Sequence, residues 1–175
     1  MKLTWFGGTT LRVYIGGQIV VIDGDQAPAG IDRGELLAGA DRVVSSNEAA
    51  LPVLDAATWR PKPGRRGIDD VPPLEIFRLA AGSLLVAAAG EPPLVVLGSS
   101  AVPRFGRWTD GAVVVLTTDS ESIIATATVL LDVARPRLIA LAADEQTLDS
   151  AIEELAEHLD GAGLVSLEPG LAVEV

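Results

Sequence analysis

The chain contains no cysteine and only one histidine, His158, among its 175 residues. Without cysteine it forms no disulfide, holds no thiolate-bound metal and offers no cysteine nucleophile. One imidazole is also too few for the histidine-rich centres in which several rings converge on an ion. The side chains that most often carry zinc and thiol chemistry are therefore missing from the sequence.

Basic residues are scarce as well, with 13 Lys and Arg against 24 Asp and Glu and a formal net charge of -11. This excess of negative charge repels nucleic acid and anionic membrane surfaces, so we expect neither as a partner. The opening "MKLTWFGG" has no apolar run of signal-peptide length, and no later stretch reaches 18 apolar residues. We expect a soluble, cytoplasmic protein.

Hydrophobic residues make up 49% of the chain, enough for one domain over residues 1–175 with a substantial core. The first third contains β-rich runs separated by glycines, "LTWF", "LRVYIGG" and "QIVVIDG", and "VYIGGQIVV" is typical of a tight hairpin. After a short helix in "DRGELLAG", the pattern predicts a buried strand in "DRVVSS" and a helix over residues 47–58. "WRPKPGRRGIDDVPP" then indicates a surface excursion.

Further strands are predicted in the second half, in "LEIFRL", "SLLVAAAG", "PLVVLGSS", "AVVVLTT" and "RLIALAA". A helix in "SESIIATATVLLDVA" ends before Arg135-Pro136. The strongest helix signal covers residues 144–160, with an apolar stripe of Leu148, Ile152, Leu155 and Leu159. "GLVSLE" and "LAVEV" are expected to form a closing strand pair. We therefore predict an α+β fold with two mixed β-sheets packed face to face, one from each half of the chain, and helices on both outer faces.

Five segments follow one another in an order typical of one hydrolase family: "MKLTWFGGTTLRVYIGGQIVVIDGD", "ADRVVSSNEAAL", "PLVVLGSS", "DVARPRLIALAAD" and "VSLEPGLAVEV". In this order the chain resembles the metallo-β-lactamase superfamily, in particular its L-ascorbate-6-phosphate lactonase-like branch. The resemblance covers nearly the whole chain. It implies a four-layer αββα sandwich and a metal-dependent hydrolase ancestry.

The metal-binding positions of that family hold other residues here. The family's Gly-His turn corresponds to Gly7-Gly8 here, and the four metal-binding positions of its motif T-H-x-H-x-D-H correspond to Ser46, Glu48, Ala50 and Leu51. The aspartate of its G-D-T motif corresponds to Ser99, and its terminal histidine corresponds to Ala143. Of these only Glu48 could bind a metal, whereas a catalytic zinc needs about three protein ligands. The resemblance therefore implies no metal, no cofactor and a relic pocket around Gly8, Asp23, Asp25, Ser46, Glu48, Ala50, Leu51, Ser99 and Ala143.

Several polar residues have two interpretations. Asp23 and Asp25 follow the "IVVI" strand and either brace the loops or line a pocket that still binds something polar. Ser99 and Ser100 would need a lysine or carboxylate as base to act as nucleophiles, because His158 is expected to be a solvated helix residue.

The only basic cluster in the chain consists of Arg60, Lys62, Arg65 and Arg66. It is either a solvated loop or a patch for an acidic partner or a phosphate-bearing ligand.

Two functions from different classes follow. In the first, the protein is a pseudoenzyme, a non-catalytic binding or assembly module that engages an unknown protein partner or forms a homo-oligomer. In the alternative, it is a hydrolase that works without metal or with one weakly held ion on Asp23, Asp25, Glu48 and Asp119. The number of lost metal ligands favours the first.

Overall fold

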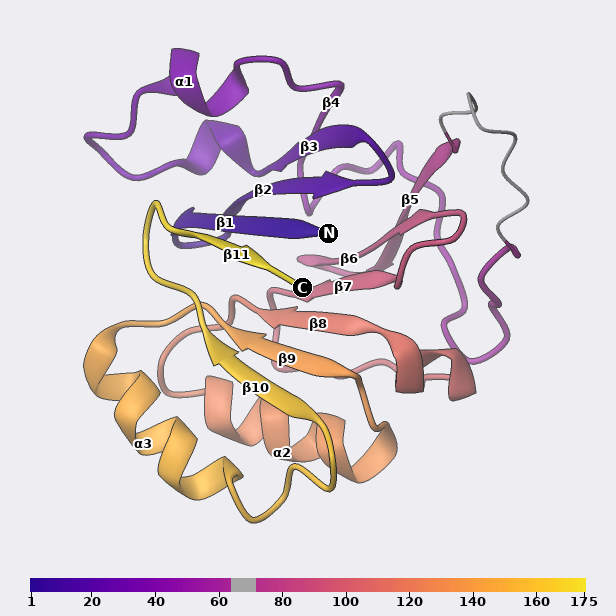
Figure 1. Cartoon of the computed structure of the whole chain (residues 1–175), viewed down its shortest axis with the longest axis vertical. Coiled ribbons are helices and arrows are strands. Elements are labelled where there is room, and N and C mark those ends of the chain that lie inside the picture. The colour runs from indigo at the N-terminus through magenta and orange to yellow at the C-terminus, as the bar shows by residue number, and fades with distance from the viewer. Residues whose placement is uncertain (64–71) are drawn as a thin grey trace.

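Two β-sheets pack face to face in the computed structural model, which describes residues 1–63 and 72–175 (Figure 1). The first sheet has the order β11-β1-β2-β3-β4. Its strands are β1 (Lys2–Gly7), β2 (Thr10–Ile15), β3 (Gln18–Ile22), β4 (Arg42–Val44) and β11 (Ala172–Glu174). The second has the order β10-β9-β8-β7-β6-β5. Its strands are β5 (Leu74–Ala80), β6 (Ser83–Ala88), β7 (Leu94–Leu97), β8 (Val113–Leu116), β9 (Leu138–Leu141) and β10 (Gly163–Ser166).

The predicted hairpin between β2 and β3 is confirmed. Gly16 and Gly17 both have positive φ angles, 59° and 83°, so they form the two-residue turn that matches the twist of antiparallel strands. The turn sets a register in which Leu11 lies opposite Ile22 and Val13 opposite Val20. These four side chains are buried on one face, as the strand alternation requires.

The second sheet changes from antiparallel to parallel at β7. Strands β5, β6 and β7 form an antiparallel meander, whereas β7, β8, β9 and β10 run parallel. Helix α2 (Ile123–Val133) connects β8 to β9, and helix α3 (Glu145–Leu155) connects β9 to β10. Because helices cover one face and the first sheet covers the other, β7 and β8 are apolar and buried at every position.

The core has two layers. One lies between the sheets, where Leu3, Trp5 and Ile22 meet Leu84, Val96 and Val115 among others. The other lies between the second sheet and helices α2 and α3, around Leu116, Leu130 and Leu155.

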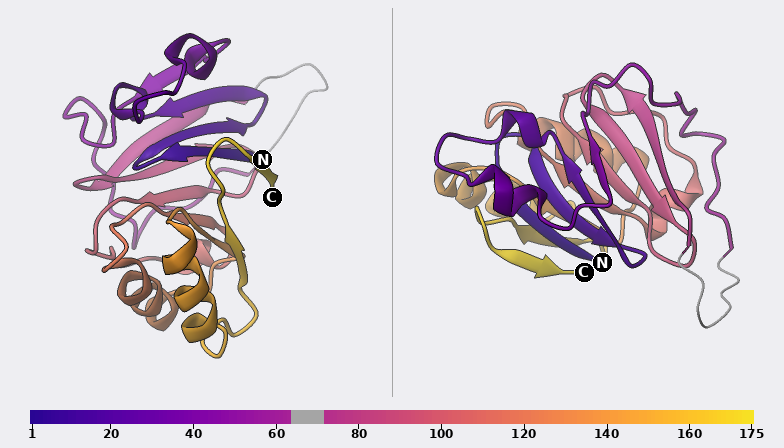
Figure 2. Two further views of the ribbon diagram at one scale, coloured as in Figure 1. Left: turned by 90° about the vertical axis from the view of Figure 1, so that its left-hand side faces the viewer. Right: turned by 90° about the horizontal axis from the view of Figure 1, so that it is seen from above.

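Helix α1 (Arg33–Leu37) lies on the outer side of the first sheet, and Arg12 holds it there by donating to the Ala38 carbonyl at 2.7 Å. Figure 2 shows the helices on opposite outer sides. The predicted α+β, αββα architecture is confirmed.

The helix predicted over residues 47–58 is wrong, since turns and extended chain replace it. Pro52 cannot donate within a helix, and its carbonyl instead accepts a hydrogen bond from the Arg78 N–H at 2.9 Å. The Leu54 N–H donates to the Arg78 carbonyl at 3.0 Å. The segment thus pairs with the edge of the second sheet next to β5.

The predicted closing strand pair is also wrong, because the two last strands belong to different sheets. Strand β10 pairs with β9, whereas β11 crosses over and pairs with β1. The N-terminal half therefore does not build the first sheet alone. The strand predicted as buried in "DRVVSS" is β4, an edge strand in which Val43 is 55% exposed.

Helix α3 is shorter than predicted and presents a different face to the core. It ends at Leu155, so His158 lies beyond the helix. Leu148, Ala151 and Leu155 are buried, whereas Ile152 is 46% exposed. None of the described helices is both long and apolar enough to cross a membrane.

Candidate functional site

The segments that correspond to the family's metal-binding motifs meet at one edge of the sandwich. Strands β7, β8 and β9 end in register at Leu97, Leu116 and Leu141, and the parallel strands β3 and β4 end side by side at Ile22 and Val44. The two sheets are linked there, because the Asn47 side-chain oxygen accepts a hydrogen bond from the Gly82 N–H at 3.0 Å. We call the segments 23–25, 45–51, 82–83, 98–100, 117–119 and 142–143 the motif edge.

Asp23 braces this edge from a fully buried position. Its backbone is left-handed, with φ 51° and ψ 37°, which turns the chain sharply after β3. Its Oδ1 accepts hydrogen bonds from the Ser46 N–H at 2.8 Å and the Ser45 hydroxyl at 3.2 Å. These contacts match loop bracing, one of the two roles considered for Asp23.

Backbone contacts also tie the strand ends of the second sheet to one another at the motif edge. The Gly98 N–H donates to the Gly82 carbonyl at 3.0 Å, and the Thr117 N–H donates to the Leu97 carbonyl at 2.9 Å. A Cβ added at Gly98 would lie only 2.5 Å from the Gly82 oxygen, so the turn before β6 and the end of β7 are in close backbone contact. Residue 98 must be glycine for this contact to form.

Three buried polar atoms at the motif edge have no hydrogen-bond partner within the described part of the chain. They are Asp23 Oδ2, Ser83 Oγ and Thr118 Oγ1. A buried polar atom without a partner costs free energy, so such atoms are rare in folded proteins. The motif edge therefore retains polar capacity that the fold does not use.

The residues of the predicted relic pocket occupy very different surroundings. Leu51 belongs to the core between the sheets, and Ala143 to the core beneath the helices, each 8% exposed. Ser46 is buried, Glu48 and Ser99 are half-buried, and Asp25 and Ala50 are exposed. At the turn, the Gly8 carbonyl accepts a hydrogen bond from the Trp5 indole N–H at 2.9 Å.

These residues do not fit a catalytic zinc centre. In residues 1–63 and 72–175, no three His, Asp or Glu side chains come close enough together to hold a metal ion. The proposed weak set of Asp23, Asp25, Glu48 and Asp119 is thus not brought together. Asp119 instead lies in the turn before α2, where hydrogen bonds from Ser122 hold the pKa of its carboxyl below the ordinary value of 3.8.

The aromatic and basic residues have structural roles where the structure describes them. Trp108 lies in the core beside Trp59 and Phe105, with ring centroids 4.8 and 5.7 Å away, so these rings pack against one another in the layer beneath the helices. Lys62 of the basic cluster forms a 2.6 Å ion pair with Glu75. Arg65 and Arg66 lie outside the described residues.

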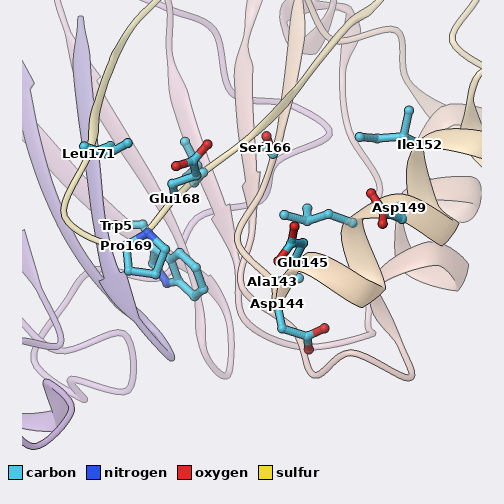
Figure 3. Close-up of a pocket in the computed structure, with 12 residues that line it drawn as sticks. Trp5, Ala143, Asp144, Glu145, Asp149, Ile152, Ser166, Glu168, Pro169 and Leu171 are labelled. Atoms are coloured by element: carbon cyan, nitrogen blue, oxygen red, sulfur yellow. The ribbon is translucent and has the colours of Figure 1, made fainter.

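A groove of about 700 Å³ opens beside the motif edge, between the start of α3 and the loop from β10 to β11 (Figure 3). We call it the α3 groove. Its lining includes Trp5, Ala143, Glu145, Leu148, Asp149, Ile152, Ser166, Glu168 and Leu171. Of the predicted relic residues, only Ala143 lines it.

Asp144 fixes the start of α3 at the mouth of this groove. Its side chain accepts hydrogen bonds from the Thr147 N–H and the Ser120 hydroxyl, both at 2.9 Å. The Thr147 N–H, assisted by the Ser120 and Thr147 hydroxyls, lowers the pKa of Asp144 below its ordinary value of 3.8. The sequence did not predict this groove, because the apolar stripe of α3 assigned Ile152 to the core. The acidic residues near Ile152 in the sequence were the one signal for an exposed surface there.

Comparison with known proteins identifies the fold but not a close relative. No protein-family model and no curated protein matches the sequence. Among solved structures, the chain is similar to an isothiocyanate hydrolase from Delia radicum gut bacteria, with a TM-score of 0.55 and 13% identity over 100% of this chain and 99% of that one.

Two further solved structures share the fold. Igni18, a metallo hydrolase from the hyperthermophilic archaeon Ignicoccus hospitalis, has a TM-score of 0.50 and 15% identity over 99% and 98% of the two chains. A Thermotoga maritima protein proposed to be a Zn-dependent hydrolase of the metallo-β-lactamase superfamily has a TM-score of 0.51 and 16% identity over 96% and 99%. The chain thus has the metallo-β-lactamase fold, as its αββα layers indicated.

Proposed function

We propose that the protein is a degenerate member of the metallo-β-lactamase superfamily, from its L-ascorbate-6-phosphate lactonase-like branch, that acts as a non-catalytic binding or assembly module. One observation carries this proposal. At the positions that correspond to metal ligands, the Leu51 and Ala143 side chains pack in the two core layers, and Ser46 uses its backbone N–H to bind Asp23. A hydrolytic zinc site needs convergent donors and an open coordination position, and these side chains supply neither.

The proposal extends to location and partners. It includes a single domain over residues 1–175, a cytoplasmic location and a protein partner or second copy of the chain. The net charge of -11 supports a protein over nucleic acid or an anionic membrane.

A second candidate function is hydrolysis without metal or with a weakly held ion. Similarity to an isothiocyanate hydrolase and to metallo hydrolases supports this alternative better than it supports a non-catalytic role. The buried Asp23 Oδ2 has no partner among the described residues, and it is the carboxylate atom among the three unpartnered polar atoms of the motif edge that could take a polar ligand. Fold similarity alone does not carry an activity.

Metal content and hydrolysis distinguish the two candidates. Protein purified without chelators and dialysed should contain well under one equivalent of zinc, iron or manganese by elemental analysis. It should not hydrolyse an isothiocyanate, a lactone or an ester above the buffer rate, with or without added Zn²⁺ or Mn²⁺. Turnover that is lost in Asp23→Asn or Glu48→Gln, but kept in the exposed-site control Glu154→Gln, would establish the hydrolase alternative instead.

A further inference from the structure

The α3 groove continues along the helix as a longer apolar channel. A second hollow of about 370 Å³ is lined by Ile152, Ala156, Leu159, Leu164, Val165 and Ser166. It shares Ile152 and Ser166 with the α3 groove, so the two form one channel between α3 and strand β10. Ile152 is 46% exposed in this channel, and Leu171 at its other end is 57% exposed. Exposed apolar side chains that line a continuous channel are typical of a binding surface.

Strand β10 presents an unpaired edge to this channel. It ends the sheet order, and its pairing in the described structure is with β9. The Gly163 and Leu167 N–H groups donate inward, to the carbonyls of Arg137 at 3.0 Å and Leu141 at 2.8 Å. Because backbone groups alternate in direction along a parallel strand, those of Leu164 and Ser166 point outward. An open edge of this kind pairs readily with an added strand.

Carboxylates gather at one end of the channel. Glu145, Asp149 and Glu168 line the α3 groove, and none of them forms a salt bridge with another described residue. An edge-to-edge dimer through β10 would bring these carboxylates and those on α3 of a second copy close together, which repulsion opposes. Charge complementarity therefore favours a basic partner over self-association.

We propose that the channel binds an extended peptide segment of a partner protein, which adds as a strand to β10. Apolar side chains of the segment pack on Ile152 and Leu164, and Lys or Arg side chains at its end pair with Asp149 and Glu168. Backbone hydrogen bonds supply the affinity and the alternate side chains supply the specificity, as in other cases of strand addition. This inference rests on the proposed binding function and names its partner chemistry.

A labelled peptide with the sequence Lys-Lys-Val-Thr-Val-Thr-Lys-Lys tests the proposal by fluorescence anisotropy. Because lysines stand at both ends, one pair can reach the carboxylates whether the peptide adds parallel or antiparallel to β10. We expect saturable binding, and at least roughly tenfold weaker binding when the four lysines are replaced by glutamates. Two further peptides carry N-methyl groups on alternate backbone nitrogens. One is methylated at the even-numbered positions and the other at the odd-numbered positions. Strand addition requires that one of them binds like the parent peptide and the other loses binding.

Protein variants locate the binding site. Asp149→Lys with Glu168→Lys should weaken binding roughly tenfold, because two pairing carboxylates become repulsive. Its matched control is Glu121→Lys with Glu154→Lys, which changes the net charge equally but lines a separate hollow between α2 and α3. Ser166→Pro removes one outward N–H of β10 and should weaken binding while the circular dichroism spectrum is unchanged.

The outcomes separate this inference from the proposed function. Equal binding of both N-methylated peptides, equal effects of the two charge-reversal pairs, or no binding of the lysine peptide would overturn strand addition at β10. None of these results would be evidence for a metal site or for hydrolysis, so the non-catalytic proposal would stand. Conversely, metal-dependent turnover would overturn the non-catalytic proposal even if the peptide still bound in the channel.

Discussion

The motif edge and the α3 groove lie next to each other, yet the polar residues in them are used in opposite ways. At the motif edge, Asp23 and Asn47 direct their side-chain oxygens at backbone N–H groups of the protein itself. At the α3 groove, Asp149 and Glu168 face solvent beside the exposed Ile152. The first arrangement stabilises the fold, whereas the second leaves charge and apolar surface available to a partner. A motif edge that gathers no metal-binding set in the described residues is thus compatible with a binding surface beside it.

The largest effect is expected when metal ligands are introduced at the motif edge and the turn beside it. Histidines at Gly8, Ser46, Glu48, Leu51 and Ala143, with aspartates at Ala50 and Ser99, would place polar groups in packed surroundings without supporting partners. We expect the metal-free variant to lose at least about 3 kcal/mol of stability. Thermal melts with and without zinc measure this. A rebuilt variant that is as stable as the parent without metal, and that binds zinc tightly, would show that the edge had not closed.

Asp23 should show the next largest effect. Asp23→Ala removes the acceptor of the Ser46 N–H and places alanine in a left-handed conformation, for an expected loss of about 3 kcal/mol. Asp23→Asn keeps an oxygen acceptor and a residue that tolerates this conformation, so it should cost about 1 kcal/mol. Urea denaturation compares the two variants. Equal losses would argue against the bracing role.

Apolar residues of the two regions should differ in their contribution to stability. Leu51→Ala creates a cavity in the core between the sheets and should cost about 2–4 kcal/mol. Leu171→Ser removes a side chain that is 57% exposed and should change stability by less than about 0.5 kcal/mol. A large loss for Leu171→Ser would mean that the groove is part of the folding core rather than a binding surface.

The smallest effect is expected at low pH from Asp119 and Asp144, the carboxylates that accept hydrogen bonds at or just before the starts of α2 and α3. Hydrogen bonds lower the pKa values of Asp119 and Asp144 below 3.8 in the folded state, so their stabilisation is present above that pH and is lost as the pH falls through the lowered values. Asp144→Asn removes the charge and should be less stable than the parent at pH 6. The two should converge as the pH falls through the lowered pKa of Asp144, and added salt should narrow the gap. A constant difference down to pH 2 would contradict this explanation.

Local patterns predicted most of the elements because the signals lay within a few residues of each other. The Gly16-Gly17 turn and the continuous apolar runs of β7 and β8 are of this kind. The helix expected over residues 47–58 failed because Pro52 and Leu54 find partners in β5, far along the chain. The position of β11 beside β1 has the same origin, since neither strand encodes its partner locally.

The candidate site was predictable only in part. The motif order placed Asp23, Ser46 and Ala143 correctly at strand ends, but it did not indicate which of them would be packed or exposed. The α3 groove combines Trp5, residues of α3 and the segment 166–171, which lie far apart in sequence. Helical periodicity assigns Ile152 to the core because it carries no information on where the sheet beneath the helix ends. Ile152 lies beside β10, the last strand of that sheet, and is therefore exposed.

The pairing of β1 with β11 also affects the order in which the protein folds. Lys2 lies opposite Glu174, and the Val175 N–H donates to the Met1 carbonyl at 3.0 Å, so the first sheet joins segments about as far apart as this sequence allows. Such contacts form slowly because a long loop must close first. Strands β1, β2 and β3 pair with near neighbours, as β5, β6 and β7 do, but the outer edge of β1 has no partner until β11 is synthesised. The first sheet is therefore completed only when the last strand of the sequence pairs with the first.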